Sequence, residues 1–217
     1  MRLAAIKIGT EEKTSLVVEH GLLPIETVNA TLGTDWPDDM LTLIRSARLD
    51  KLNSWYTDEG KEIVDSLIEG TIPVHDAVMA PLYRRPRKIW GIGLNYVEHA
   101  SDLSEEAPTA APASFMKPDT TIIGYGDTIE IPLQSAKTTA EAELGVVIGK
   151  QCKNVEQEDW LDVVAGFTTI IDMTAEDILR QNPRYLTMSK SFDTFFSFGP
   201  QLATPDEIQY PFSLKVS

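Results

Sequence analysis

The sequence has almost no cysteine, no long apolar run and few cations for its number of acids. Its 217 residues include one cysteine, Cys152, which excludes an internal disulfide and a zinc site built from paired cysteines. No apolar stretch is long enough to span a bilayer, and the N-terminus lacks the apolar core of a secretory signal peptide. We therefore expect a cytoplasmic protein that does not insert into a membrane.

Acidic residues dominate the charge. The chain has 33 Asp and Glu against 19 Lys and Arg, a net charge of −14. Such a surface repels nucleic acid and anionic membranes, so neither is an expected partner. It also repels small anions, and an enzyme for organic acids would need a local positive centre, such as a bound cation beside a lysine. The same charge fits plain solubility or a salt-rich cytoplasm.

Several common catalytic motifs are missing. The chain has no G-x-x-x-x-G-K-[ST] phosphate loop and no G-x-S-x-G nucleophile turn. Gly91 and Gly93 follow an expected strand but lack the third glycine of a dinucleotide site. No serine lies in a recognisable triad. These absences disfavour nucleotide binding and serine-hydrolase chemistry.

Short strands and frequent turns predict an α+β, mainly β fold. The prolines and arginines of residues 81–86 indicate a linker, so we predict a small N-terminal α/β domain over 1–82 and a second domain over 83–217. The chain ends inside an expected strand, and we expect it to be incomplete at its C-terminus. Helices are expected over 38–49, 61–68 and 95–103, and strands over 2–8, 15–19, 88–93, 120–123, 128–131, 140–149, 164–171 and 212–216.

Three carboxylates are the strongest chemical signal. Glu141 and Glu143 alternate with apolar residues in a strand pattern, so both project from one face, while Ala142, Leu144, Val146 and Ile148 predict a core face. Asp172 follows another apolar strand. Three oxygen ligands without His or Cys suit Mg²⁺, Mn²⁺ or Ca²⁺. The alternative is a solvated strand face, with Asp172 capping the next helix.

Two further positions attract attention. Lys190 lies among small and aromatic residues, so it is a candidate for an inward-facing partner of an oxyanion or carboxylate, although most lysines are solvated. His99 and Asp102 are three residues apart and would share a helix face, as a base that activates water requires. An exposed His–Asp pair without function is an equal alternative. Thr174 and Asp177 have the spacing of a capping box.

Five motifs occur in order over residues 86–206: KIWGIGLNYVEHASD, SFMKPDTTIIGYGDTI, AEAELGVVIGK, VAGFTTIIDMTAEDIL and SKSFDTFFSFGP. Together they resemble the fumarylacetoacetate hydrolase family. The resemblance implies a mixed β-sandwich or roll, a homodimer, and a bound Mg²⁺ or Mn²⁺, with Ca²⁺ as a substitute in crystals. The residues before 82 resemble the variable N-terminal domain of bacterial and archaeal members.

The resemblance also implies a role for each matching residue. It makes Glu141, Glu143 and Asp172 the metal ligands and Lys190 a contact to substrate oxygens. His99, with Asp102, would activate water from a lid. Further candidates for substrate binding are Lys117, Arg180 and Arg184.

The sequence departs from the family pattern in three places. Asp102 stands where the hydrolases usually have Glu. Glu176 and Leu179 stand where an Arg and a Gln commonly meet the substrate carboxylate, and Arg180 and Arg184 are our candidates to replace them. The closing G-D and T-G-T-P segment is absent.

The resemblance favours metal-dependent hydrolysis of a C–C bond in a small 2-oxo or 1,3-diketo acid, such as an acylpyruvate. An isomerase or decarboxylase of a hydroxymuconate-type diacid in aromatic catabolism is the alternative. A metal-binding relative without catalysis is a third, supported by the changes at positions 176 and 179.

Chelation tests the metal hypothesis. Three clustered carboxylates without a cation raise one another's pKa and destabilise the fold, so EDTA should lower the melting temperature. Thermal unfolding, followed before and after metal removal is verified by elemental analysis, checks this expectation. An unchanged melting temperature after verified removal would count against a tightly bound ion.

Overall fold

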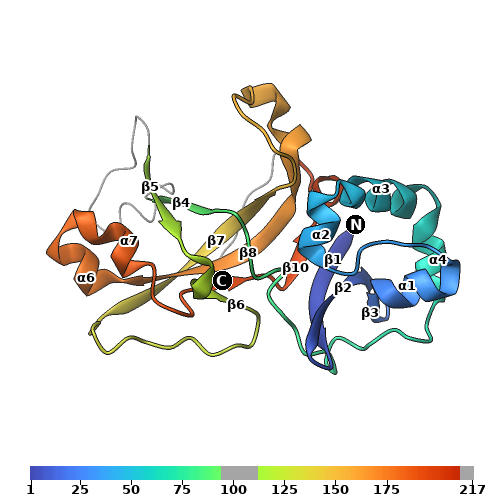
Figure 1. Ribbon diagram of the computed structural model, residues 1–217, viewed down its shortest axis with the longest axis horizontal. Coiled ribbons are helices and arrows are strands. Elements are labelled where there is room, and N and C mark those ends of the chain that lie inside the picture. Colours follow the sequence, from blue (N-terminus) through green and yellow to red (C-terminus); the bar gives the residue numbers. More distant parts are fainter. Residues whose placement is uncertain (94–111, 211–217) are drawn as a thin grey trace.

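The computed structural model describes residues 1–93 and 112–210, and an eight-stranded mixed sheet forms their centre (Figure 1). The strand order is β3-β2-β1-β10-β8-β9-β6, and β7 pairs with β8. Only the β6–β9 pair is parallel among the pairings of this sheet that the described residues make. The strands are β1 (Arg2–Ile8), β2 (Glu11–Val18), β3 (Gly21–Pro24), β6 (Ile122–Ile123), β7 (Thr138–Ile148), β8 (Val164–Ala175), β9 (Phe196–Phe198) and β10 (Gln201–Ala203). The predicted α+β, mainly β fold is confirmed.

A separate antiparallel hairpin pairs β4 (Ile89–Gly93) with β5 (Ala113–Lys117). Helices α1 (Ile25–Leu32), α2 (Met40–Arg45), α3 (Arg48–Trp55) and α4 (Lys61–Ser66) lie beside β1, β2 and β3, whereas α6 (Glu176–Gln181) and α7 (Leu186–Ser189) lie at the opposite end of the molecule (Figure 1). A π-helical turn, Tyr56–Gly60, links α3 to α4.

The helix expected over residues 38–49 is two helices. Asp39 caps the first, because its side chain accepts a hydrogen bond of 2.7 Å from the Thr42 amide. Ala47 then adopts a left-handed backbone with φ of 55°, which separates α2 from α3. The apolar spacing identified the buried face correctly but not this break.

One apolar core joins the two ends of the described chain. Leu3 on β1 pairs in register with Leu202 on β10, and β10 in turn pairs with β8 at Phe167. Both leucines are fully buried in a cluster that also contains Leu82 and Ile170. The N-terminal segment therefore shares a sheet and a core with later residues. The division into domains at residue 82 stays a prediction.

Strand β8 is longer than expected, and this changes two local predictions. Asp172 lies inside β8 rather than after its end, because pairing with β7 continues to Ala175. The capping box is wrong: Thr174 is extended, and Asp177 instead accepts hydrogen bonds from the Ser135 hydroxyl and the Ala136 amide. Residues 128–131 form no strand.

The core face predicted for β7 is also wrong. Val146 and Ile148 are about half exposed, at 46% and 54%, whereas Val147, on the face of the glutamates, is 4% exposed. Residues 143–147 of β7 line a pocket together with the hairpin of β4 and β5, and Val147 packs in the main apolar cluster. None of the elements in the described ranges buries Val146 or Ile148.

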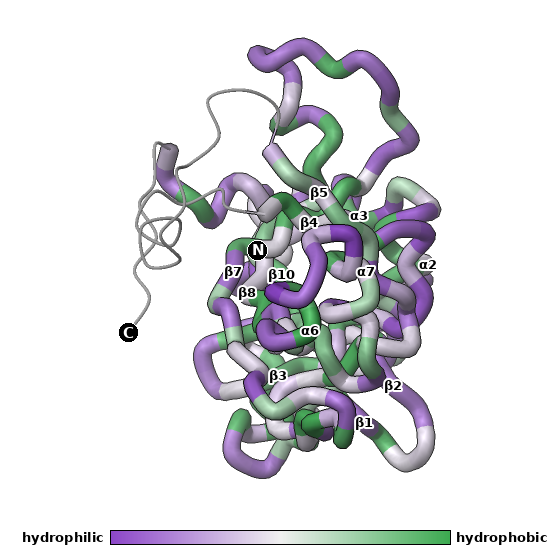
Figure 2. The backbone as a smooth tube through the Cα atoms, turned by 90° about the vertical axis from the view of Figure 1, so that its left-hand side faces the viewer, coloured by the Kyte–Doolittle hydropathy of each residue, from purple (hydrophilic) through white to green (hydrophobic). Residues whose placement is uncertain are grey.

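Between β7 and β8 the chain projects from the body (Figure 1). Residues 150–160 of this projection are exposed, and most are hydrophilic (Figure 2). In residues 1–93 and 112–210, no helix has the length and apolar character needed to cross a bilayer. The helix expected over 95–103 and the strand expected over 212–216 lie outside the described residues.

Leu202 tests the connection between β1 and β8. Leu202→Ala should lower the free energy of unfolding by about 2–5 kcal/mol, because it leaves a cavity in the shared core. Urea denaturation measures this change. Leu133→Ala is the matched control, since Leu133 is fully exposed and its truncation should cost about 0.5 kcal/mol or less. Equal effects of the two substitutions would contradict the shared core.

Candidate active site: a carboxylate and lysine cluster

The pairing of β7 with β8 brings the carboxylates together. Glu141 lies directly opposite Asp172 in the antiparallel register, and Glu143 lies opposite Ile170. Residues two apart on a strand share a face, so both glutamates project on the side of Asp172. The register of β7 against β8 therefore explains why the three acids project on the same side, as the sequence predicted.

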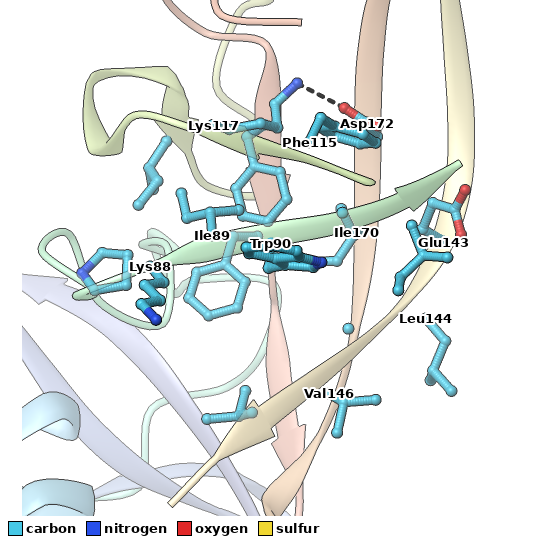
Figure 3. A pocket seen from close by; sticks show the side chains of 18 of the residues that line it. Lys88, Ile89, Trp90, Phe115, Lys117, Glu143, Leu144, Val146, Ile170 and Asp172 are labelled. Atoms are coloured by element: carbon cyan, nitrogen blue, oxygen red, sulfur yellow. Dashed lines mark hydrogen bonds and ion pairs between the residues drawn. The ribbon is translucent and has the colours of Figure 1, made fainter. Parts of the chain in front are cut away.

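Two buried lysines pair with Asp172, one on each oxygen. Lys117, the last residue of β5, places Nζ 2.6 Å from Oδ1 of Asp172, as Figure 3 shows. Lys190, which follows α7, places Nζ 2.7 Å from Oδ2. All three residues are at most 5% exposed. Of the two alternatives that the sequence left for Lys190, the buried, inward-facing one is correct, although most lysines are solvated.

The ammonium of Lys190 donates hydrogen bonds to three oxygen acceptors. Besides Asp172, it donates to the Thr174 hydroxyl at 2.6 Å and to Oε2 of Glu141 at 3.2 Å. Its Nζ also lies 4.6 Å from the centre of the Phe115 ring, within the range of a cation–π contact. These contacts hold the charged end of Lys190 against the two strands.

The cluster buries several charged groups, which is electrostatically costly. Buried ion pairs are at best a weak source of stability, so groups of buried charges often mark functional sites. Burial lowers the pKa of Lys117 to about 8, although the neighbouring Asp172 charge opposes this shift. Among the contacts of the described residues, Asp172 faces two ammonium groups, and Glu141 shares one of them.

A pocket of about 400 Å³ opens beside this cluster. Asp172, Lys117 and Glu143 line one end of it, and the labelled apolar side chains of Ile89, Trp90, Phe115, Leu144, Val146 and Ile170 line much of the rest (Figure 3). Lys88 lies at the end opposite Asp172. The pocket thus presents a charged end and an apolar body.

The predicted metal ligands fit a divalent cation in chemistry. Within residues 1–93 and 112–210, no three His, Cys, Asp or Glu side chains lie close enough together to hold an ion as they stand. Instead the ammonium of Lys190 bridges Glu141 and Asp172. The donor set nevertheless consists of oxygens alone and projects on one side of two paired strands, which suits Mg²⁺ or Mn²⁺.

The other predicted residues have different positions. Arg180 is exposed and donates to Glu176 at 2.7 Å, and Arg184 is exposed in the short turn before α7; neither lines the pocket. Glu176 is also paired with Lys137 at 2.6 Å. These two partners, Lys137 first, lower the pKa of Glu176. His99 and Asp102 lie outside the described residues.

Sequence reasoning missed two contributors to the cluster. Thr174 is 2% exposed, and its hydroxyl donates to Oε1 of Glu141 at 2.9 Å. Its position two residues after Asp172 in a strand was the available signal. Phe115 lies over Gly91, its partner in the β4–β5 register. No sequence pattern indicated this packing.

The described residues thus form a mixed-sheet α+β fold in which a cluster of buried acids and lysines lies beside a pocket. Residues 88–217, more than half of the chain, match the family described as fumarylacetoacetate (FAA) hydrolase C-terminal. The chain belongs to the fumarylacetoacetate hydrolase family, which confirms the resemblance.

Named relatives include a tautomerase, a hydrolase and an isomerase. The mitochondrial oxaloacetate tautomerase of Xenopus laevis is 39% identical over 141 residues, which are 64% of this chain and 44% of the relative. Maleylpyruvate hydrolase of Sphingobium sp. SYK-6, whose structure contains manganese(II) and pyruvate, superposes with a TM-score of 0.71 and 27% identity over 97% of this chain and 70% of its own. A 2-hydroxyhepta-2,4-diene-1,7-dioate isomerase of Mycobacterium marinum matches with a TM-score of 0.53 and 29% identity over 62% of this chain and 48% of its own. The chain spans about half the length of the curated relatives it matches.

The packing of Phe115 on Gly91 is testable. A methyl group at Gly91 would overlap the Phe115 ring, whereas one at Gly93 would have no atom closer than 3.7 Å among the described residues. Gly91→Ala should therefore lower the free energy of unfolding by about 1–3 kcal/mol through overpacking. Gly93→Ala, on the same strand, should change it by about 0.5 kcal/mol or less. Urea denaturation of both variants measures these changes. An unchanged free energy of unfolding in Gly91→Ala would show that the Phe115 ring is free to move.

Proposed function

We propose that this protein is a divalent-metal-dependent enzyme that hydrolyses a C–C bond in a small 2-oxo or 1,3-diketo acid of the acylpyruvate type. The observation that carries the proposal is the cluster in which Lys117 and Lys190 pair with both oxygens of Asp172, opposite Glu141. Buried charges in this number, at the end of a pocket, are suited to catalysis more than to stability.

The ligand set proposed for the ion is Glu141, Glu143 and Asp172. An Mg²⁺ or Mn²⁺ ion bound there supplies a Lewis acid that polarises the adjacent oxygens of a 2-oxo acid. Manganese and pyruvate in the related maleylpyruvate hydrolase support this choice of ion and substrate class.

The chain's own residues would handle charge and protons. Lys190 offers a fixed ammonium to a substrate oxygen that gains negative charge as the bond breaks. His99, oriented by Asp102, would take the proton of a water that adds to the acyl carbonyl carbon. The bond from that carbon to the methylene then breaks, the acyl part leaves as a carboxylic acid, and the methylene carbon is protonated to give pyruvate. The apolar wall of the pocket suits the acyl part.

A second candidate is tautomerisation or isomerisation of a small oxo diacid. The 39% identity to an oxaloacetate tautomerase favours it, and the same polarised oxygens serve both reactions. Decarboxylation of a hydroxymuconate-type diacid belongs to the same group. Lys137 and Arg180 neutralise Glu176, so this departure adds no uncompensated negative charge, and the non-catalytic relative stays the third alternative. The expected homodimer stays a prediction.

Turnover of acetylpyruvate, fumarylpyruvate, oxaloacetate and a hydroxymuconate-type diacid, with and without Mg²⁺, tests the proposal. The product distinguishes hydrolysis from isomerisation and decarboxylation. Lys190→Met should lower kcat by about 10²–10³-fold, since it removes the charge that stabilises the reacting oxygen. The kcat is measured at saturating Mn²⁺, because Lys190 also hydrogen-bonds the proposed ligands Glu141 and Asp172 and its loss should change Mn²⁺ affinity as well.

Lys150→Ala is the charge-matched control. Lys150 is exposed on the projecting segment and pairs with Asp50 at 3.4 Å, so its loss should leave turnover unchanged. Full activity in Lys190→Met would show that the role given to Lys190 is wrong. Absence of metal-dependent turnover across the panel, with Mn²⁺ bound, would favour the non-catalytic relative.

A further inference from the structure

The hydroxyl of Thr174 lies at the centre of the charged cluster, although no catalytic pattern includes it. Thr174 is on β8 two residues after Asp172, so both side chains project from the same face. It is 2% exposed and touches two charged groups: Nζ of Lys190 at 2.6 Å and Oε1 of Glu141 at 2.9 Å.

The direction of these hydrogen bonds is fixed by chemistry. An ammonium only donates, so the Thr174 hydroxyl accepts from Lys190. The single hydroxyl proton is then free for Glu141, whose ionised carboxylate only accepts. Thr174 therefore accepts a hydrogen bond from the cation and donates one to the carboxylate. Hydrogen bonds linked in such a chain strengthen one another.

Both carboxylate oxygens of Glu141 therefore accept a hydrogen bond. Oε1 accepts from Thr174 and Oε2 accepts from Lys190 at 3.2 Å. The rotation of the carboxylate about its last bond is restricted as a result. The three protons of the Lys190 ammonium are likewise distributed among Asp172, Glu141 and Thr174.

A purely structural role for the hydroxyl is less convincing. β-branched residues favour strands whether or not their hydroxyl is bonded. Thr168 lies on the same strand and the same face and is 5% exposed, yet its hydroxyl has no partner within the described part of the chain. As far as the described residues show, the strand thus buries the Thr168 hydroxyl without a partner, whereas the Thr174 hydroxyl has two charged partners.

We propose that Thr174 is a positioning residue that sets the orientation of Glu141 and Lys190 relative to each other. The inference rests on the proposed function, in which Glu141 binds a divalent cation and Lys190 acts on the substrate. Groups that hydrogen-bond a metal-ligating side chain typically change metal affinity or activity about 10–100-fold when they are removed. Thr174 meets that description for Glu141 and orients the catalytic lysine as well.

The experiment compares Thr174→Val, Thr174→Ser and Thr168→Val by Mn²⁺ titration calorimetry, and by kcat and KM on a panel substrate that is turned over. Thr174→Val should lower Mn²⁺ affinity about 10–100-fold and lower kcat more than it raises KM. Thr174→Ser keeps the hydroxyl and should restore both to within a few-fold. Thr168→Val should match the wild type. Thr174→Ala replaces the valine variant if that protein does not fold.

Two outcomes would overturn the inference: wild-type Mn²⁺ affinity in Thr174→Val, or a serine variant as impaired as the valine. The metal-free protein gives an independent check, because Thr174→Val and Lys190→Met should be non-additive in their effects on the free energy of unfolding. Additive effects would contradict the positioning role. A wild-type protein that binds no Mn²⁺ but retains this non-additivity would overturn the proposed function alone.

Discussion

The pairing of Asp172 with two buried lysines is the constraint on which the rest of the site depends. A carboxylate with 5% exposure is costly without partners, and here each of its oxygens accepts from a different ammonium. Each lysine in turn needs other acceptors, which Lys117 finds in the Met173 carbonyl and Lys190 in Glu141 and Thr174. Removing either lysine would leave one oxygen of Asp172 without its ammonium, and removing Asp172 would take a carboxylate from both buried lysines.

The fold brings these groups together from segments that are distant in the chain. Lys117 ends the β4–β5 hairpin, Asp172 lies inside the longest described strand, and Lys190 follows a short helix. Their charged ends meet because β7 and β8 form a rigid platform and the two lysines approach it from other elements. Sheet continuity from β1 through β10 to β8 fixes that platform to the N-terminal core.

The sequence was sufficient for the parts that depend on local periodicity. Alternation placed Glu141 and Glu143 on one face, and the ordered motifs identified the family. It failed where tertiary contacts decide: β7 buries Val147 rather than its neighbours, because Val147 packs in the main apolar cluster. The pairing of Lys117 with Asp172 spans 55 residues, and no local pattern encodes such a contact. Thr174 looked like a helix cap because its spacing to Asp177 suits one, but strand pairing extends past it.

The site residues also influence which register β7 and β8 adopt when the chain folds. A slip of one residue would turn Glu141 and Glu143 away and present Ala142 and Leu144 to the lysines. Lys190 would then lose its bond to Glu141, and Asp172 would face an alanine. The misaligned sheet would keep its backbone hydrogen bonds but would place apolar side chains where Glu141 now accepts from Lys190 and Thr174, at a cost in free energy. The charged residues of the site therefore also favour the correct register of β7 and β8 over a register shifted by one residue.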